Sequence, residues 1–170
     1  GWPRARGDVA MKGVVERRAV LRGLGEVFRA HGYEGASLTL IAEATGLGKG
    51  SLYHLFPGGK EQMAAEVLAD IDAWFELNIY APLREASDPA RAIAAMIAGV
   101  DRYFHSGDRV CLVGLVALGS ARDTFAEAVD GYFARWQAAL AQLLRRSGLS
   151  KGQAQRRAED ALLTIQGALV

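Results

Sequence analysis

The chain contains a single cysteine, Cys111, in 170 residues. A disulfide framework within the chain is therefore excluded, and such scarcity of thiols is typical of proteins that work in a reducing cytosol. No apolar run approaches the ~18–20 residues that a membrane-spanning helix needs. These absences predict a cytoplasmic protein with no membrane partner.

The sequence also lacks the spacings that hold metals or perform catalysis. It contains no Cys-x-x-Cys pair, no His-x-x-x-His pair and no phosphate-binding P-loop. The three histidines and Cys111 would have to supply any chemistry, and His105 and Cys111 are too far apart to be neighbours on one helix. We therefore expect no enzyme, no cofactor and no metal site.

Strand-like alternation and internal repeats are absent as well, whereas apolar residues recur at helical spacing, which predicts an all-α fold. One run, residues 110–119, is apolar almost throughout. It could form a buried strand, but the chain offers no partner strands, so we interpret it as a buried helix.

The most informative stretch lies between Ser37 and Lys60. Ser37 suits the N-cap of a short helix, and Gly46 suits the left-handed conformation that ends it. Seven residues are in register for two short helices with a sharp turn between them: Ser37, Ile41, Ala42, Gly46, Leu47, Leu52 and Leu55. Such a pair is the bihelical unit whose second helix enters the DNA major groove.

The second of these helices is unusually polar for a core helix. Lysine and hydroxyl groups bind phosphate oxygens, and glycine allows close approach of the backbone. Pro57 should end this helix, and a lysine beside the free N–H groups of the next helix start favours an anion. The candidate DNA contacts are Ser37, Thr39, Gly48, Lys49, Gly50, Ser51, Tyr53, His54 and Lys60. The alternative is two ordinary core helices joined by a glycine turn.

Residues 41–57, followed by Lys60 and Glu61, resemble the DNA-binding domain of the TetR family of bacterial transcriptional repressors. The apolar run 111–118 is similar to the LmrA/YxaF-like branch of that family. The resemblance implies a homodimer that represses transcription at a palindromic operator and releases DNA when a small molecule binds. Many members carry Ser or Thr where this chain has Gly48, so one helix cap is missing.

Charge is divided unevenly along the chain. Residues 1–60 hold nine Lys/Arg and five Asp/Glu, whereas residues 61–170 hold eleven and fourteen. A basic N-terminal third suits a DNA reader attached to a separate effector body. The expected organisation is a flexible basic arm at 1–12, a three-helix helix-turn-helix DNA-binding domain at 13–60, and a helical ligand-binding and dimerisation domain at 61–170.

Apolar spacing and turn residues predict the helices of the C-terminal domain. A helix from Gly59 to about Asn78 should end before Pro82, and Asp88 or Ser87 should cap another at about 89–105. Two long amphipathic helices, 122–146 and 150–170, carry more apolar surface than one small core requires. We expect them to pair with their copies across a two-fold axis as a four-helix bundle.

A small apolar or aromatic effector is the expected ligand of this domain, because its middle helices are rich in aromatic residues. The candidate pocket residues are Trp74, Phe75, Met96, Tyr103, Phe104, His105, Cys111, Leu115 and Trp136. Tyr103 and His105 are the best polar candidates. Aromatic residues at helical spacing are also the usual filling of a core. A helical small-molecule carrier or adaptor with no role at DNA is the alternative function.

Overall fold

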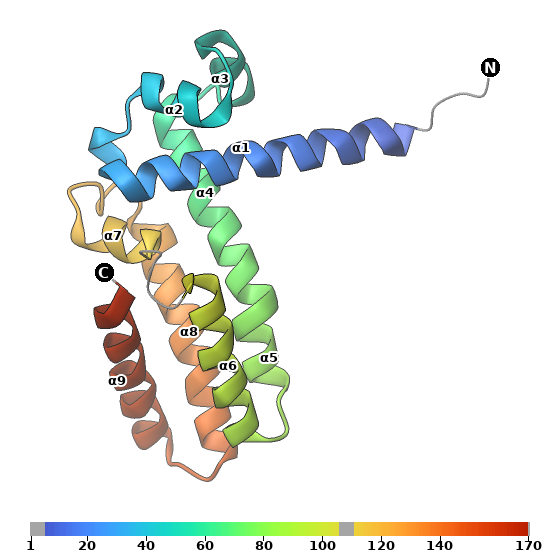
Figure 1. Cartoon of the computed structure of the whole chain (residues 1–170). Helices are drawn as coiled ribbons and strands as arrows, with labels where there is room; N and C mark the ends of the chain where they lie inside the picture. The colour runs from blue at the N-terminus through green and yellow to red at the C-terminus, as the bar shows by residue number, and fades with distance from the viewer. Residues whose placement is uncertain (1–5, 106–110, 170) are drawn as a thin grey trace. The chain divides into compact units, whose positions relative to one another are not determined.

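The structure is a computed structural model that describes residues 6–105 and 111–169, with side chains described for 16–105 and 111–168 (Figure 1). Its helical segments are α1 (Arg6–Gly35), α2 (Leu38–Thr45), α3 (Lys49–Leu55), α4 (Gly59–Phe75), η1 (Glu76–Tyr80), α5 (Ala81–Glu85), α6 (Pro89–Tyr103), α7 (Leu112–Leu118), α8 (Ala126–Arg146) and α9 (Lys151–Leu169). No strand occurs in the described part of the chain, and the all-α prediction is confirmed.

The chain divides into two compact units at the junction of Val67 and Leu68. This junction lies inside α4, somewhat later than the domain boundary expected at residue 60. The first turns of α4 belong to the first unit because Met63, Ala64 and Val67 are buried. A helix that continues through a boundary leaves no break in the sequence pattern to mark it.

Helix α1 buries the apolar stripe that its spacing predicts. Val20, Leu24, Val27 and Phe28 are all buried. A Cβ atom added at Gly23 would lie 3.1 Å from the carbonyl oxygen of Ala44 on α2. Helices α1 and α2 therefore cross closely at Gly23, and a larger residue there would push them apart.

Helix α1 is longer at both ends than the helix over residues 13–31 that the apolar spacing of Val20, Leu24 and Phe28 predicts. It begins at Arg6, so residues 6–12, expected to be a flexible arm, are helical, while residues 1–5 of that arm lie outside the described residues. Extending an existing helix costs far less than nucleating one, and residues 8–12 hold no proline. At the other end, Gly32 adopts φ 70° and kinks the helix, which resumes to Gly35.

The structure also differs from expectation at Pro82. This proline lies in the first turn of α5, and α4, η1 and α5 follow one another without a break. Proline lacks an N–H and its ring crowds the carbonyl of the preceding turn. The wider π turn of η1, in which the N–H of Ala81 donates to the carbonyl of Glu76, accommodates the proline inside the helix.

The remaining helices of the second unit largely follow the prediction. The Asp88 carboxylate caps α6 by accepting the N–H of Arg91 at 3.1 Å, and residues 112–118 form the buried helix α7. Helix α8 begins at Ala126 and not at Arg122, because residues 119–125 form bends and turns.

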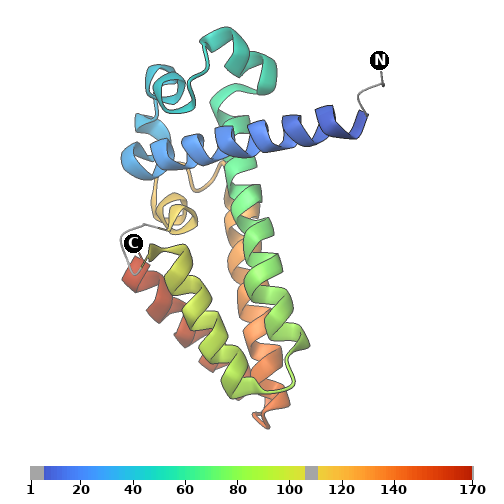
Figure 2. The ribbon, with the colours of Figure 1, turned by 45° about the vertical axis from the view of Figure 1, so that its right-hand side comes forward.

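Helix α9 runs back along α8 after a short turn (Figures 1 and 2). The Ser150 hydroxyl accepts the N–H of Gln153 at 3.3 Å and so begins α9 as predicted. The buried face of α9 consists of Ala154, Ala158 and Leu162. None of the described helices is both long and apolar enough to cross a membrane.

Candidate nucleic-acid interface

The first helix of the predicted bihelical unit is capped at both ends as its sequence indicates. The Ser37 hydroxyl accepts the N–H of Leu40 at 3.2 Å. Ile41 is fully buried. At the C-terminal end, Gly46 adopts φ 71° and its N–H donates to the carbonyl of Ala42 at 2.9 Å. These local bonds fix the direction in which the chain enters α3.

Helix α3 is anchored by apolar residues and exposes its polar ones. Leu52 and the following Phe56 are fully buried. Gly48 occupies the N-cap position with no side-chain hydrogen bond, as expected from the absence of a hydroxyl there. Nearly all candidate DNA contacts are exposed: Ser37, Thr39, Gly48, Lys49, Gly50, Ser51, Tyr53 and His54. Exposure on one short helix and its flanks is what major-groove entry requires.

Lys60 differs from the other candidates because it is half-buried. Its ammonium nitrogen lies 4.7 Å from the centroid of the Tyr33 ring, a cation–π contact. Burial raises the pKa of the Tyr33 hydroxyl, and the carboxylates of Glu61 and Glu34 raise it further. The ring orients Lys60 at the start of α4, just after Gly59 at φ 69°.

The cations of α1 were not among the candidates, and the structure separates them into two kinds. Arg17 forms an ion pair with Glu66 and lies over the Phe56 ring, 4.9 Å from its centroid, so it braces the unit. Arg18 and Arg22 lie about one turn apart and are exposed. Their four-residue spacing, which puts both on one face of the helix, was the signal in the sequence that could have found them.

The effector candidates fall into a tight ring cluster within the second unit. Phe75 is its centre, with ring centroids 5.2 Å from Tyr103 and 5.3 Å from Trp136. Trp74 lies 4.4 Å from Tyr103. Phe104 lies 6.2 Å from Phe75. The structure thus brings together candidates from three helices.

Met96 connects this cluster to a groove. Its sulfur accepts the indole N–H of Trp136 at 3.4 Å. It also lines a groove of about 280 Å³ that lies between η1 and α5 on one side and α6 on the other. A molecule bound in that groove would therefore be separated from the aromatic cluster by the Met96 side chain.

Two tyrosines belong to the cluster but were missed by sequence reasoning. The Tyr80 hydroxyl donates to the carbonyl of Tyr132 at 3.2 Å, and both residues are buried. Burial raises the pKa of both hydroxyls well above the usual tyrosine range. The apolar spacing of Val129, Phe133 and Trp136 predicts one buried stripe on α8, but Phe133 is half-buried at its edge and Tyr132 packs into the core.

The remaining effector candidates lie in different environments, from exposed to buried. His105 is exposed, with φ 50°, and Leu115 is half-buried on α7. Cys111 is buried, and its sulfur accepts the N–H of Gly114 at 3.3 Å at the start of α7. Across the described residues, no group of three or more His, Cys, Asp or Glu side chains could hold a metal ion.

Comparison with protein families identifies both parts of the chain. Residues 20–67 match the family of bacterial regulatory proteins called the tetR family. Residues 89–170 match the C-terminal domain of the LmrA/YxaF-like transcriptional regulators. The first match covers α2 and α3, and the second covers α6 to α9.

Individual relatives extend this likeness over most of the chain. The HTH-type transcriptional regulator LmrA of Bacillus subtilis strain 168 is 28% identical over 158 residues, which is 91% of this chain and 84% of LmrA. The uncharacterized HTH-type transcriptional regulator YxaF of the same organism is 30% identical over 142 residues, 81% of this chain and 74% of YxaF.

A solved structure shares the fold. It contains a double cysteine variant of the TetR family transcriptional regulator CifR, in complex with 26-bp double-strand operator DNA. The TM-score is 0.62 at 24% identity, and the match covers 88% of this chain and 93% of that one.

Proposed function

The chain belongs to the TetR family of DNA-binding transcriptional regulators, a family of regulators and not of enzymes, and we propose that it acts in the cytoplasm as a homodimeric repressor that a small apolar or aromatic effector releases from its operator. Membership in the family favours this function over that of a helical carrier or adaptor. The observation that carries the proposal is the α2–α3 unit, with its capped first helix, its left-handed turn at Gly46 and its exposed polar second helix.

In the proposed complex, α3 lies in the major groove. Lys49 reads a base edge, for which guanine is the commonest target of lysine. Ser37, Thr39 and Lys60 bind phosphates on either side, and these contacts set the position of α3 without reading sequence. Exposure of Lys49 and His54 supports these roles.

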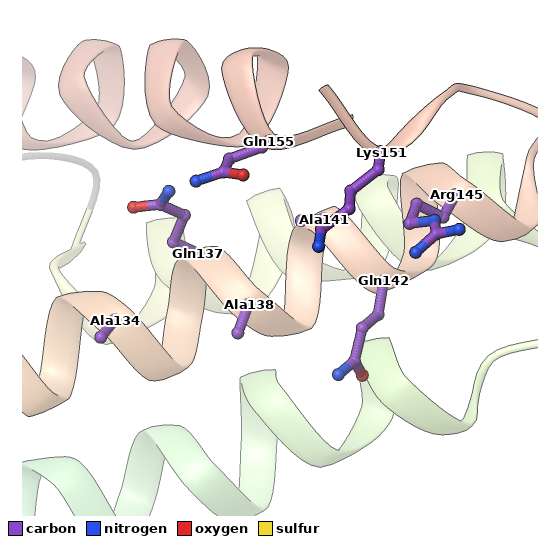
Figure 3. Close-up of a pocket in the computed structure, with 8 residues that line it drawn as sticks. All are labelled: Ala134, Gln137, Ala138, Ala141, Gln142, Arg145, Lys151 and Gln155. Atoms are coloured by element: carbon purple, nitrogen blue, oxygen red, sulfur yellow. The ribbon is translucent and has the colours of Figure 1, made fainter. Parts of the chain in front are cut away.

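One helix of this length makes too few contacts for operator-grade specificity, so we infer a dimer. Two copies on half-sites one helical turn apart, ~34–36 Å, supply the missing contacts on a palindromic operator. The α8–α9 surface supports pairing, because α8 presents a line of small residues there, Ala134, Ala138 and Ala141 (Figure 3). Leu163 on α9 is 73% exposed in the single chain and would be available for contact with a second copy.

The proposed effector acts on the ring cluster around Phe75. A ligand shifts an equilibrium only if it binds one conformation better than the other. An apolar or aromatic molecule that displaces a ring of the cluster meets this condition, because the rings come from α4, α6 and α8. Release of DNA then follows if the favoured conformation spreads the α3 helices beyond half-site spacing.

The test is binding of the full chain to duplexes from the region upstream of its own gene, over a range of salt concentrations. Several phosphate contacts predict a steep loss of affinity as salt rises. The control is Arg91→Ala, which removes an exposed cation of the second unit and should leave DNA affinity unchanged. An absence of binding to every such duplex at low salt would count against the proposal and favour the carrier.

The dimer is tested separately by analytical ultracentrifugation at micromolar concentration. We expect a mass of two chains. A single-chain mass under all conditions would refute the dimer. The Leu163→Asp variant, which places a charge on the proposed pairing surface, should shift the equilibrium toward monomer. Leu77→Asp is its matched control, since Leu77 is exposed to a similar degree but lies on η1.

A further inference from the structure

A groove of about 370 Å³ lies between α8 and α9 in the second unit (Figure 3). Besides the alanines of α8, its lining consists of five polar side chains: Gln137, Gln142 and Arg145 from α8, and Lys151 and Gln155 from α9. Arg145 and Lys151 lie on opposite sides of the turn between the helices. The groove is thus polar at the α8–α9 turn and apolar along its floor.

Hydrogen-bond donors dominate this lining. Guanidinium carries five N–H groups and ammonium three, and neither accepts a hydrogen bond. No carboxylate is among the described residues that line the groove. A carboxylate does engage one of the lining residues, since Glu159 accepts the side-chain N–H of Gln137 at 3.1 Å. Among the described residues, neither Glu159 nor any other carboxylate forms an ion pair with Arg145 or Lys151. Such a surface is therefore suited to bind an anion that carries several hydrogen-bond acceptors.

The surrounding turn carries a concentration of positive charge. Residues 145–157 hold five cations and no acidic residue: Arg145, Arg146, Lys151, Arg156 and Arg157. Arg146 is engaged with the carbonyl of Leu83 at 2.6 Å. The other four are exposed and form no ion pair within the described residues.

Three other arginines of the same unit form ion pairs. Arg84 pairs with Glu76. Arg122 pairs with Asp130, and Arg135 pairs with Asp72. Carboxylates of this unit therefore form ion pairs with several of its arginines, but within the described ranges none of them pairs with the exposed cations at the α8–α9 turn. A run of unpaired cations beside a groove with no acid is a local property of this turn.

The role inferred below for these cations rests on the proposed dimer, because that dimer would bring them into the interface between the two copies. If two copies join through the α8–α9 surface, each brings its own Arg145 and Lys151 to the shared interface. Like charges placed together and partly removed from water oppose association unless an opposite charge compensates them. Each groove is open to solvent in the single chain, and the second copy would cover that opening.

We propose that a small multivalent oxyanion, either a phosphate or a polycarboxylate, occupies this groove between the two copies, and that dimer formation is linked to its binding. Arg145 and Lys151 supply the charge, and the glutamine amides supply further N–H donors. The anion binds the dimer better than the monomer, because the site is incomplete until the second copy closes it. By linkage, the anion strengthens the dimer and hence operator binding.

The experiment measures the monomer–dimer Kd of the full chain by sedimentation equilibrium at constant ionic strength. Chloride is replaced in separate arms by phosphate, pyrophosphate or propane-1,2,3-tricarboxylate. We expect at least one of these anions, at millimolar concentration, to lower the Kd about tenfold, as linkage predicts for an anion at about ten times its own Kd. The arms distinguish a phosphate ligand from a carboxylate one.

Two variants localise the effect. Arg145→Gln combined with Lys151→Gln should remove the response to the anion and dimerise in chloride at least as tightly as the unaltered chain. Arg91→Gln removes an exposed cation outside this groove and should keep the full response.

Equal Kd values in chloride and in all three anions would overturn the inference while leaving the dimer intact. A dimer that weakens with rising salt, whatever the anion, would also overturn it, because ion pairs between the copies would then compensate the cations. A chain that stays monomeric in every arm would instead refute the dimer on which the inference rests.

Discussion

The two units keep their functional side chains in opposite environments. In the first unit most of the candidate DNA contacts are exposed on α3 and its flanks, and α3 is anchored by the fully buried Leu52 and the following Phe56. In the second unit most of the effector candidates pack against one another, with the Phe75 ring next to those of Tyr103 and Trp136. The first site depends on local helix geometry, and the second depends on the packing of helices far apart in sequence. Substitutions at the first site should therefore change DNA binding without changing stability, whereas substitutions at the second site should change effector response and stability together.

The largest expected effect is in the ring cluster. Trp136→Ala removes a fully buried side chain and should lower the free energy of unfolding by about 3–5 kcal/mol, because the cavity is lined by rings that cannot collapse into it. Urea unfolding followed by circular dichroism measures this. Trp136→Phe is the control and should cost much less. A loss below about 1 kcal/mol for Trp136→Ala would mean that the cluster is not a close-packed core.

A functional effect without a stability effect is expected at Lys49. Lys49→Ala should reduce discrimination between operator and altered operator by about 1–3 kcal/mol if Lys49 reads a base. Lys60→Ala and His54→Ala should weaken binding to all duplexes by similar factors, since phosphate contacts carry no sequence information. Competition binding with single-base operator variants separates the two classes. An unchanged sequence preference in Lys49→Ala would remove its base-reading role.

The two glycines that flank the turn should respond in opposite directions to the same substitution. Gly46→Ser forces a side chain into φ 71° and should cost about 1–2 kcal/mol of stability. Gly48→Ser supplies the missing cap of α3 where an added Cβ meets nothing within 4 Å, and should gain a few tenths of a kcal/mol. Thermal unfolding of both variants tests the pair. Destabilisation by Gly48→Ser would show that the N-cap position needs glycine for another reason.

The smallest expected effect is a pH dependence beside the π turn. The hydrogen bond from Arg84 lowers the pKa of Glu76 below its usual 4.5. A lowered pKa in the folded chain means that the stabilisation is present above 4.5 and is lost as pH falls through the lowered value. Glu76→Gln should therefore be slightly less stable than the unaltered chain at neutral pH, and the gap should close in acid. Because both side chains are well exposed, solvent screening keeps the gap small. Urea unfolding of both chains at neutral and acid pH measures the gap, and a gap that widens in acid would contradict the pairing.

The local features of the fold could be predicted because each depends on a few neighbouring residues. The Ser37 cap, the left-handed Gly46 and the Asp88 cap all follow from one side chain and its next turn. Pro82 was interpreted as a helix end because proline usually breaks a helix. The structure keeps the helix by widening one turn at η1, where Ile79 and Tyr80 are buried.

The candidate sites likewise divide into features set by neighbouring residues and features set by contacts between helices. The exposure of α3 follows from its residue pattern, whereas the contact of Lys60 with the Tyr33 ring joins residues from two helices. The ring cluster was predicted as a set of aromatic residues, but Tyr80 and Tyr132 were missed. The stripe through Val129 and Trp136 is buried as expected, and Tyr132, three residues after Val129 and four before Trp136, lies on the same face, whereas Phe133 lies at its edge.

By itself, the sequence determined the all-helical class, the helix-turn-helix between Ser37 and Leu55, the missing cap at Gly48 and the membership in a family of DNA-binding regulators. The first three follow from short-range periodicity and from steric rules that act within a few residues, whereas the family follows from the resemblance of residues 41–57 to its DNA-binding domain. Only the tertiary structure decided that Tyr80 and Tyr132 enter the ring cluster, how Pro82 stays within a helix, and that Arg145 and Lys151 face one groove. Those outcomes depend on contacts between residues distant in sequence, where burial and packing outweigh local preference.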